Sequence, residues 1–216
     1  MNLSKAIKER RSIRAFREES VEIKTVEEVL EMAIQAPSAL NLQPYEFNVV
    51  MNEERQRLSR RLLKAYREKR IGCSPGTSEP LPERFNRRME KTFRIMRPKI
   101  EAVGATYENF INEESLKFYG APVAIVICID KVLPKSHLVS IGAALGYLVL
   151  AAHSKGLGTC PIGLVKSYAY EVKDALNITD DKEVVIGVAL GYPDWDSPVN
   201  SFKIPRDALK EVTRWI

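Results

Sequence analysis

Three guanidinium groups and a hydroxyl fall within five residues near the amino terminus, at Arg10, Arg11, Ser12 and Arg14. Guanidinium groups bind phosphate oxygens through paired hydrogen bonds and stay charged at any physiological pH. The cluster therefore suits a terminal phosphate attached to an electron-rich ring. A solvated surface cluster is the alternative, because exposed charges are the common outcome for such residues.

A second chemical segment is the polar turn PSALNLQP, residues 37–44. Prolines at both ends restrict the backbone, while Ser38, Asn41 and Gln43 offer uncharged donors and acceptors that suit the edge of a planar heterocycle. An ordinary connecting turn is the alternative, since Asn and Ser favour turns for local reasons.

The third segment, GLGTCPIG at residues 156–163, contains glycines that allow a backbone to approach a flat ligand closely. Helix termination explains Gly156 equally well. The chain contains neither a GxGxxG nor a Walker A pattern, so the sequence does not indicate a Rossmann dinucleotide site or a P-loop.

Hydrophobic periodicity predicts the elements that position these segments. A helix is expected from Thr25, with Thr25 and Glu28 at capping-box spacing, and Pro37 is expected to end it. The other expected helices are Glu53–Lys69, Glu83–Ala102 and Ile141–Ala152, and the expected strands are Tyr45–Met51, Ala121–Ile129 and Glu183–Leu190. A short amphipathic segment is expected at Asp207–Ile216. The class is α+β or α/β.

Length and composition predict one globular domain, residues 1–216, and the proline- and glycine-rich run at 71–82 is expected to be an inserted loop. The amino terminus lacks the apolar stretch of a signal peptide, and the uncharged stretch Leu138–Ala152 is too short for a membrane span. The cysteines lack CxxC spacing and the two histidines lie far apart, so no metal site is expected. A cytoplasmic protein fits best.

Positive charge is concentrated in residues 54–101, where fifteen Lys or Arg face six Glu; this net +9 leaves −4 for the rest of a chain whose total is +5. A solvated helical face explains most such runs, and steering of an anionic substrate or cofactor is the functional interpretation.

Taken in order, the segments ERRSIRAF, APSALNLQPYEF, LAAHSKGLGTCPIG and VVIGVALGYPD, together with Arg206, resemble the nitroreductase family. The resemblance covers nearly the whole chain except roughly residues 71–114. It implies an α+β fold, a three-layer α/β/α sandwich with a mostly antiparallel central sheet. It also implies a homodimer formed through long helices, with FMN at the interface.

The resemblance also assigns site residues. Arg10, Arg11 and Ser12 would hold the FMN phosphate and ribityl chain, with Arg206 and Lys203 assisting, and Arg14 would lie near the pyrimidine side. The other subunit would line the flavin with Pro37, Ser38, Ala39 and Asn41, supported by Gln43. Backbone groups around Pro161, Ile162, Gly163 and Leu164 would face flavin N5.

The implied activity is electron transfer from NADH or NADPH to a small organic acceptor, such as a nitroaromatic or quinone, by a ping-pong cycle. No side chain is assigned as a catalytic acid, base or nucleophile, because the flavin carries the chemistry. The insertion at 71–114 is expected to act as a lid that sets acceptor choice. Two alternatives stay open: a flavin-binding store or sensor without turnover, and a basic nucleic-acid-binding module, which lacks a stacking array of aromatic residues. Neither nucleic acid nor a membrane is an expected partner.

Overall fold

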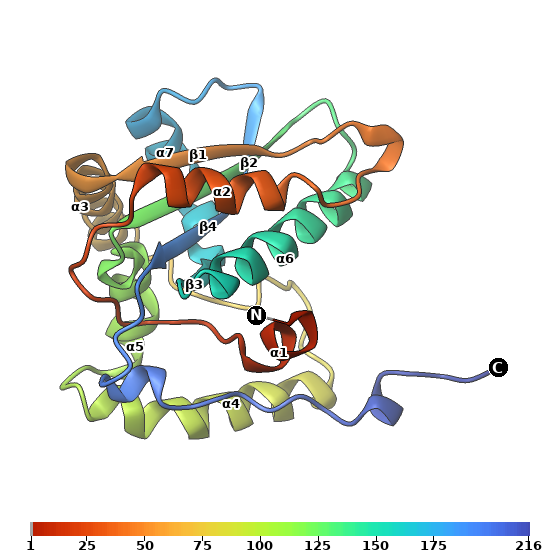
Figure 1. The fold of residues 1–216 in the computed structure, drawn as a ribbon. Coiled ribbons are helices and arrows are strands. Elements are labelled where there is room, and N and C mark those ends of the chain that lie inside the picture. The colour runs from red at the N-terminus through yellow and green to blue at the C-terminus, as the bar shows by residue number, and fades with distance from the viewer. Residues whose placement is uncertain (1) are drawn as a thin grey trace.

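The computed structural model describes residues 2–216 and contains a four-stranded sheet with strand order β1-β2-β4-β3. The strands are β1 (Glu46–Met51), β2 (Val123–Asp130), β3 (Gly158–Ile162) and β4 (Lys182–Gly191). All three strand pairs are antiparallel. β3 lies at one edge of the sheet, next to the amino-terminal segment that follows the first helix (Figure 1).

Helices cover both faces of this sheet (Figure 1). The α-helices are α1 (Leu3–Glu9), α2 (Ile23–Ala33), α3 (Asn52–Lys69), α4 (Glu83–Glu101), α5 (Tyr107–Asn109), α6 (Leu138–Ser154) and α7 (Ala169–Leu176). Helices α2 and α6 lie on one face, and α3 and α7 lie on the other. The predicted α+β, three-layer architecture is confirmed.

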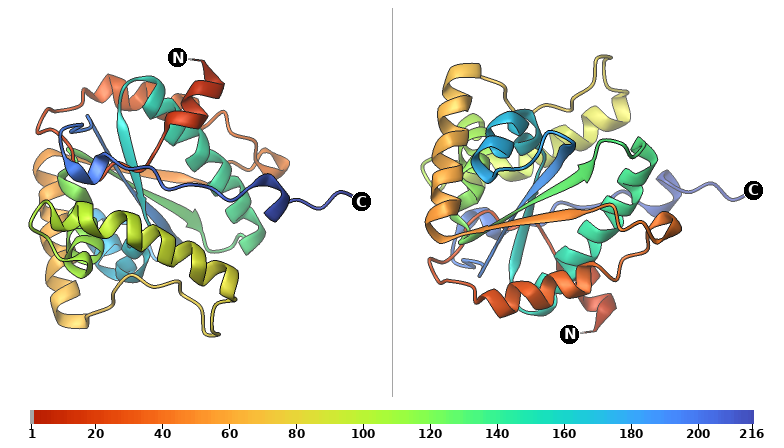
Figure 2. Two further views of the ribbon diagram at one scale, coloured as in Figure 1. Left: turned by 90° about the horizontal axis from the view of Figure 1, so that it is seen from below. Right: turned by 90° about the horizontal axis from the view of Figure 1, so that it is seen from above.

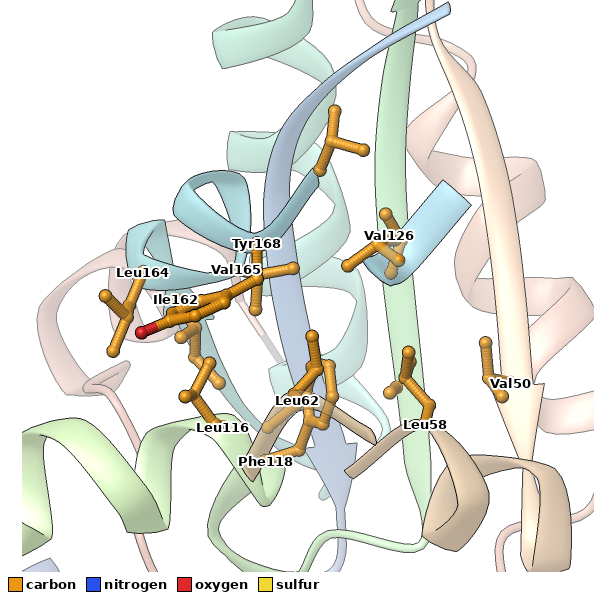
Figure 3. Close-up of a cluster of buried hydrophobic side chains, with 14 of the residues drawn as sticks. Val50, Leu58, Leu62, Leu116, Phe118, Val126, Ile162, Leu164, Val165 and Tyr168 are labelled. Carbon is orange, nitrogen blue, oxygen red and sulfur yellow. The ribbon is translucent and has the colours of Figure 1, made fainter. Parts of the chain in front are cut away.

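Alternating side chains of β2 build the two halves of the core. Ile125 and Ile127 point to the side of α2 and α6, while Val126 and Cys128 point to the side of α3 and α7. All four are fully buried, which explains why this strand has a continuous apolar sequence. Figure 3 shows the second half, where Leu58 and Leu62 of α3 pack against Phe118, Val165 and Tyr168.

The predicted start of α2 was wrong. The helix begins at Ile23, and its N-cap residue Glu22 makes no side-chain capping bond. Val21 and Val26 flank this start and are buried in the same cluster, an arrangement in which hydrophobic contact fixes the entry of the chain. Burial therefore overrode the capping-box pattern of Thr25 and Glu28. The helix also ends at Ala33, ahead of Pro37.

One strand was not predicted, and one further expectation needs correction. The glycine-rich segment forms edge strand β3, where Pro161 is tolerated because an edge strand does not need every backbone N–H. The carboxyl-terminal segment is largely irregular and contains only a 3₁₀ turn at Leu209–Glu211. Its apolar side chains Leu209, Val212 and Trp215 are exposed, so the chain itself offers them no packing surface.

The segment at 71–114 is tied to the body by α4 and α5 (Figure 2). Met96 and Ile100 of α4 are buried in a cluster with Phe110 and Val199, and Phe202 and Ile204 pack against it. The preceding loop is anchored at its start, where Tyr168 Oη donates to the Ile71 carbonyl at 2.7 Å and Asn112 accepts from the Cys73 N–H at 2.7 Å. Helix α4 thus lies alongside the carboxyl-terminal segment.

Helix α6 has two different faces. Ile141, Leu148 and Ala152 are buried against the sheet, whereas Val139 and Tyr147 are exposed. By length and composition, residues Lys135–Ser154 would be able to cross a membrane, and 39% of that apolar stretch is buried inside the chain. The packing shows a core helix with one apolar strip left uncovered by this chain.

Candidate functional site

The amino-terminal arginine segment is held in extended form beside β3. Ser12 forms a parallel bridge with Thr159, and the Ile13 N–H donates to the Thr159 carbonyl at 2.9 Å. Ile13 is buried, and a Cβ at Gly158 would lie 2.6 Å from its Cγ1. Gly158 is therefore needed for close packing of this segment. Gly156, with φ +78°, follows the end of α6, which confirms helix termination for that glycine.

Asn200 ties both ends of the chain together at this segment, a role that sequence patterns did not indicate. Its Oδ1 accepts from the Arg14 N–H at 2.8 Å, and its Nδ2 donates to the carbonyls of Ala15 and Asp194, each at 2.8 Å. The side chain is buried, so these bonds are shielded from water. A lone Asn in a polar loop carries no sequence signal for such a clamp.

With Asn200 holding the two chain ends together, the amino-terminal arginines and the pair Lys203 and Arg206 share one cavity of about 680 Å³. The cavity is lined by the predicted residues Arg10, Arg11, Ser12, Arg14, Lys203 and Arg206, and also by Lys8. Gly146, Val149 and Leu150 of α6 and Phe202 and Ile204 provide its apolar surface. No carboxylate lines it among residues 2–216.

Electrostatics in this cavity favour an anion. Burial and the neighbouring Arg206 guanidinium lower the pKa of Arg10, which means that the charged form lacks compensation. The Nε atoms of Arg11 and Arg14 are buried and lack a hydrogen-bond partner in residues 2–216. Unpaired buried donors are costly, so these side chains are suited to an anionic or oxygen-rich ligand.

The Arg11 side chain also faces a second, smaller cavity. Its guanidinium lies 4.8 Å from the centre of the Trp195 ring, and both residues line a 210 Å³ space with His153. The family resemblance assigned Arg11 to the phosphate and ribityl chain and gave no sign of this second cavity. Burial lowers the pKa of His153, with Arg10 and Arg11 adding to the effect and Glu9 opposing it.

Aromatic side chains surround Arg14. Tyr119 and Tyr107 both lie close enough to interact with its charge, and Tyr107 belongs to α5 of the insertion. Phe118 and Tyr119 have φ of +54° and +52°, which is unfavourable for bulky residues and marks a strained turn. Burial raises the pKa of the Cys160 thiol, so this neighbour of Arg14 stays protonated.

The polar turn at residues 37–44 lies away from the arginine cavity. The Ala39 N–H donates to Ser140 Oγ at 3.4 Å, near the start of α6, whereas Gly146 and Leu150 line the cavity. At about 1.5 Å per helical residue, these contacts are roughly 9–15 Å apart along α6. Leu40, Asn41 and Gln43 have φ near +50°, at 53°, 55° and 48°. One chain therefore does not bring Pro37, Ser38, Ala39, Asn41 or Gln43 to the cavity.

The last predicted group lies where β3 ends and a 3₁₀ segment, Gly163–Tyr168, begins. Ile162 and Leu164 are buried, Pro161 is half-buried and Gly163 is exposed. None of these four residues lines the arginine cavity. Because Ser12 pairs in parallel with Thr159, Arg14 and Pro161 lie in the same direction from that bridge.

Known proteins resemble this chain along nearly its whole length. The model of the nitroreductase family matches residues 7–192. The chain is 31% identical to 4-nitrobenzoate reductase of Pseudomonas putida over 212 residues, covering 96% of this chain and 92% of that protein. It is 32% identical to chloronitrobenzene nitroreductase of Comamonas testosteroni over 219 residues, covering 97% and 95%.

Among solved structures, the chain is similar to the FMN-dependent nitroreductase NfnB from Mycobacterium smegmatis in complex with NADPH. That similarity has a TM-score of 0.88 at 30% identity, covering 99% of this chain and 97% of that one.

Proposed function

The chain belongs to the nitroreductase family and is an oxidoreductase, and from that premise we propose that it uses FMN to pass electrons from NADPH or NADH to a small organic acceptor. One observation carries the proposal. Six cationic side chains and no carboxylate line a single cavity, which the two ends of the described chain build together. The acceptor is proposed to be a nitroaromatic or a quinone.

The cavity residues fit FMN. A phosphate would compensate for both the burial and the neighbouring Arg206 charge, which lower the pKa of Arg10. Val149, Leu150 and Phe202 add apolar surface that suits the rest of a planar cofactor. We therefore assign the phosphate and ribityl chain to Arg10, Arg11, Ser12, Lys203 and Arg206, and the pyrimidine side of the ring to Arg14.

We propose that the functional form is a homodimer with FMN at the interface. The turn residues would reach the flavin from the partner subunit, because the arginine cavity of their own chain lies too far from them along α6. These residues are Pro37, Ser38, Ala39, Asn41 and Gln43. Uncovered apolar side chains support such an interface: Leu40 is 89% exposed, Val139 79% and Trp215 86%.

When bound, FMN would supply the electron-transfer chemistry. The chain's own part is to bind and orient. Arg14, a fixed cation, would stabilise negative charge that develops on the ring, and backbone groups of Pro161, Ile162, Gly163 and Leu164 would face the ring edge. No side chain is assigned as a dedicated acid or base, and solvent would supply the protons that the acceptor takes up. Donor and acceptor would occupy the same space in turn, as a ping-pong cycle requires.

Two finer points complete the proposal. The insertion at 71–114 is proposed to act as a lid over the acceptor, and Tyr107 near Arg14 supports this role. A cytoplasmic location is proposed because Cys73, Cys128 and Cys160 are all free thiols.

Initial-rate kinetics test the mechanism. NADPH is varied at several fixed concentrations of 4-nitrobenzoate, with the FMN-loaded protein. Parallel double-reciprocal lines are expected, since the first product must leave before the acceptor binds. Intersecting lines contradict the shared site. A protein that binds FMN but oxidises neither nucleotide with any acceptor contradicts the proposed activity.

A further inference from the structure

The positive charge of residues 54–101 is not evenly neutralised in the fold. Helix α3 carries seven Lys or Arg and three Glu, and so does α4. On α3, carboxylates pair with Arg57, Arg61, Arg67 and Lys69. On α4, the one cation with a carboxylate partner in residues 2–216 is Arg88, which contacts Asp207 at 2.6 Å. Of seven cations on each helix, three on α3 and six on α4 therefore lack a carboxylate partner in the described residues, and most of the uncompensated charge lies on α4.

A cavity of about 430 Å³ lies between this helix and the carboxyl-terminal segment. Arg88, Lys91 and Thr92 of α4 line one side, and residues 204–207 line the other. Its charged groups are three cations and one carboxylate, while Ile204, Pro205 and Val212 add apolar surface. A charged group joined to an apolar body fits such a lining.

This cavity adjoins the arginine cavity. Ile204, Pro205 and Arg206 line both spaces, so the two are separated by a single extended stretch of chain. A molecule that reacts in the larger cavity therefore has a cationic space beside it. Asp207 already binds Arg88, which leaves Lys91 as the α4 cation in this space without a carboxylate partner in the described chain.

We propose that the space between α4 and residues 204–207 is an anion subsite that binds the charged group of a substrate seated in the arginine cavity. Two sources share this chemistry: the 2′-phosphate that distinguishes NADPH from NADH, and the carboxylate of an acidic nitroaromatic. Lys91 is the specificity-determining residue, and Asp207 limits the charge of the subsite by holding Arg88. The inference rests on the proposed oxidoreductase activity and deepens it by naming the substrate class.

Two variants with opposite expected effects test the subsite. Lys91→Met removes the charge but keeps an unbranched apolar side chain, and Asp207→Asn releases Arg88. Lys64→Met, an exposed cation of α3, is the matched control. Each FMN-loaded variant is assayed for kcat/KM with NADPH and NADH, and with 4-nitrobenzoate and nitrobenzene. Calorimetry with NADP⁺ and NAD⁺ gives a binding readout that does not depend on turnover.

Lys91→Met is expected to lower one ratio of kcat/KM values about tenfold, the value of one charge-assisted contact. That ratio is either NADPH over NADH or 4-nitrobenzoate over nitrobenzene. Asp207→Asn is expected to raise the same preference, and Lys64→Met to leave it unchanged. The pair that responds identifies the source of the anion.

Unchanged preferences in both Lys91→Met and Asp207→Asn, with NADH and nitrobenzene turnover intact, would overturn the subsite alone. A wild-type protein that oxidises neither nucleotide would refute the proposed function, and the subsite with it.

Discussion

Replacing Arg206 with alanine should weaken FMN binding without destabilising the empty protein. The side chain is exposed, and its recorded hydrogen bond runs from its own Nη1 to the Ile204 carbonyl at 3.0 Å. Burial lowers the pKa of Arg10, and the Arg206 charge lowers it further, so without a phosphate the pair is repulsive. Arg206→Ala removes that repulsion in the empty protein and removes a phosphate contact in the loaded one.

The expected magnitude follows from the contact. A hydrogen bond to a charged group contributes about 1.5–3 kcal/mol, which corresponds to a Kd about 10- to 150-fold higher. At FMN equal to 100 times the wild-type Kd, binding stabilises the fold by about 2.7 kcal/mol; a 30-fold weaker variant gains only about 0.9 kcal/mol. For a chain of this length, the FMN-induced rise in Tm falls from roughly 5–11 °C to roughly 2–4 °C.

Thermal melts with and without FMN measure this directly, and recovery of free-flavin fluorescence gives the Kd. Lys64→Ala, which removes a charge from the exposed side of α3, is the control and should keep the full shift. An FMN-induced shift in Arg206→Ala equal to that of the wild type would refute the phosphate assignment. A lower Tm of the empty variant would refute the repulsion argument.

Four other perturbations test separate parts of the account. Asn200→Ala removes three hydrogen bonds and should lower the free energy of unfolding, measured by denaturant titration, by about 2–3 kcal/mol. FMN binding should weaken as well, and unchanged stability would contradict the role of Asn200 in joining the two chain ends. Gly187→Ala places a Cβ 2.7 Å from Val165 Cγ2 and should cost about 1–3 kcal/mol by the same measurement. Gly142→Arg adds a long charged side chain to the exposed side of α6 and should convert a dimer into a helical but FMN-free monomer in size-exclusion chromatography. Burial lowers the pKa of His153 in the folded protein, so the unfolded state binds more protons and stability falls as the pH drops from about 7 to 5. In His153→Gln, thermal melts across that range should show a Tm that depends less steeply on pH.

The parts of the fold that were predictable from sequence are those with strong hydrophobic periodicity. Strand β2 and helix α6 were predicted because nearly every inward position in them is apolar. The same apolar pattern therefore indicated which residues are buried and which type of element they form. The start of α2 and the strand at Gly158–Ile162 were not, because each depends on a tertiary partner. Val21 and Val26 pack into a distant core, and β3 takes an edge position that tolerates Pro161.

The site divides in the same way. The motif near the amino terminus predicted Arg10, Arg11, Ser12 and Arg14, and the family resemblance added Lys203 and Arg206. The structure gathers all six in one cavity. Asn200, Trp195 and Tyr119 were missed, because their roles arise only when segments far apart in sequence meet. The roles of the polar turn and of the residues from Pro161 to Leu164 stay predictions, since their contacts with a cofactor need a second chain and a bound flavin.

The most direct test of the central claim is the visible spectrum of the purified protein during an anaerobic redox cycle. The account predicts flavin absorbance that bleaches when NADPH or NADH is added and returns when a nitroaromatic acceptor follows. A colourless protein that FMN cannot reconstitute, or a flavin that neither nucleotide reduces, would contradict it.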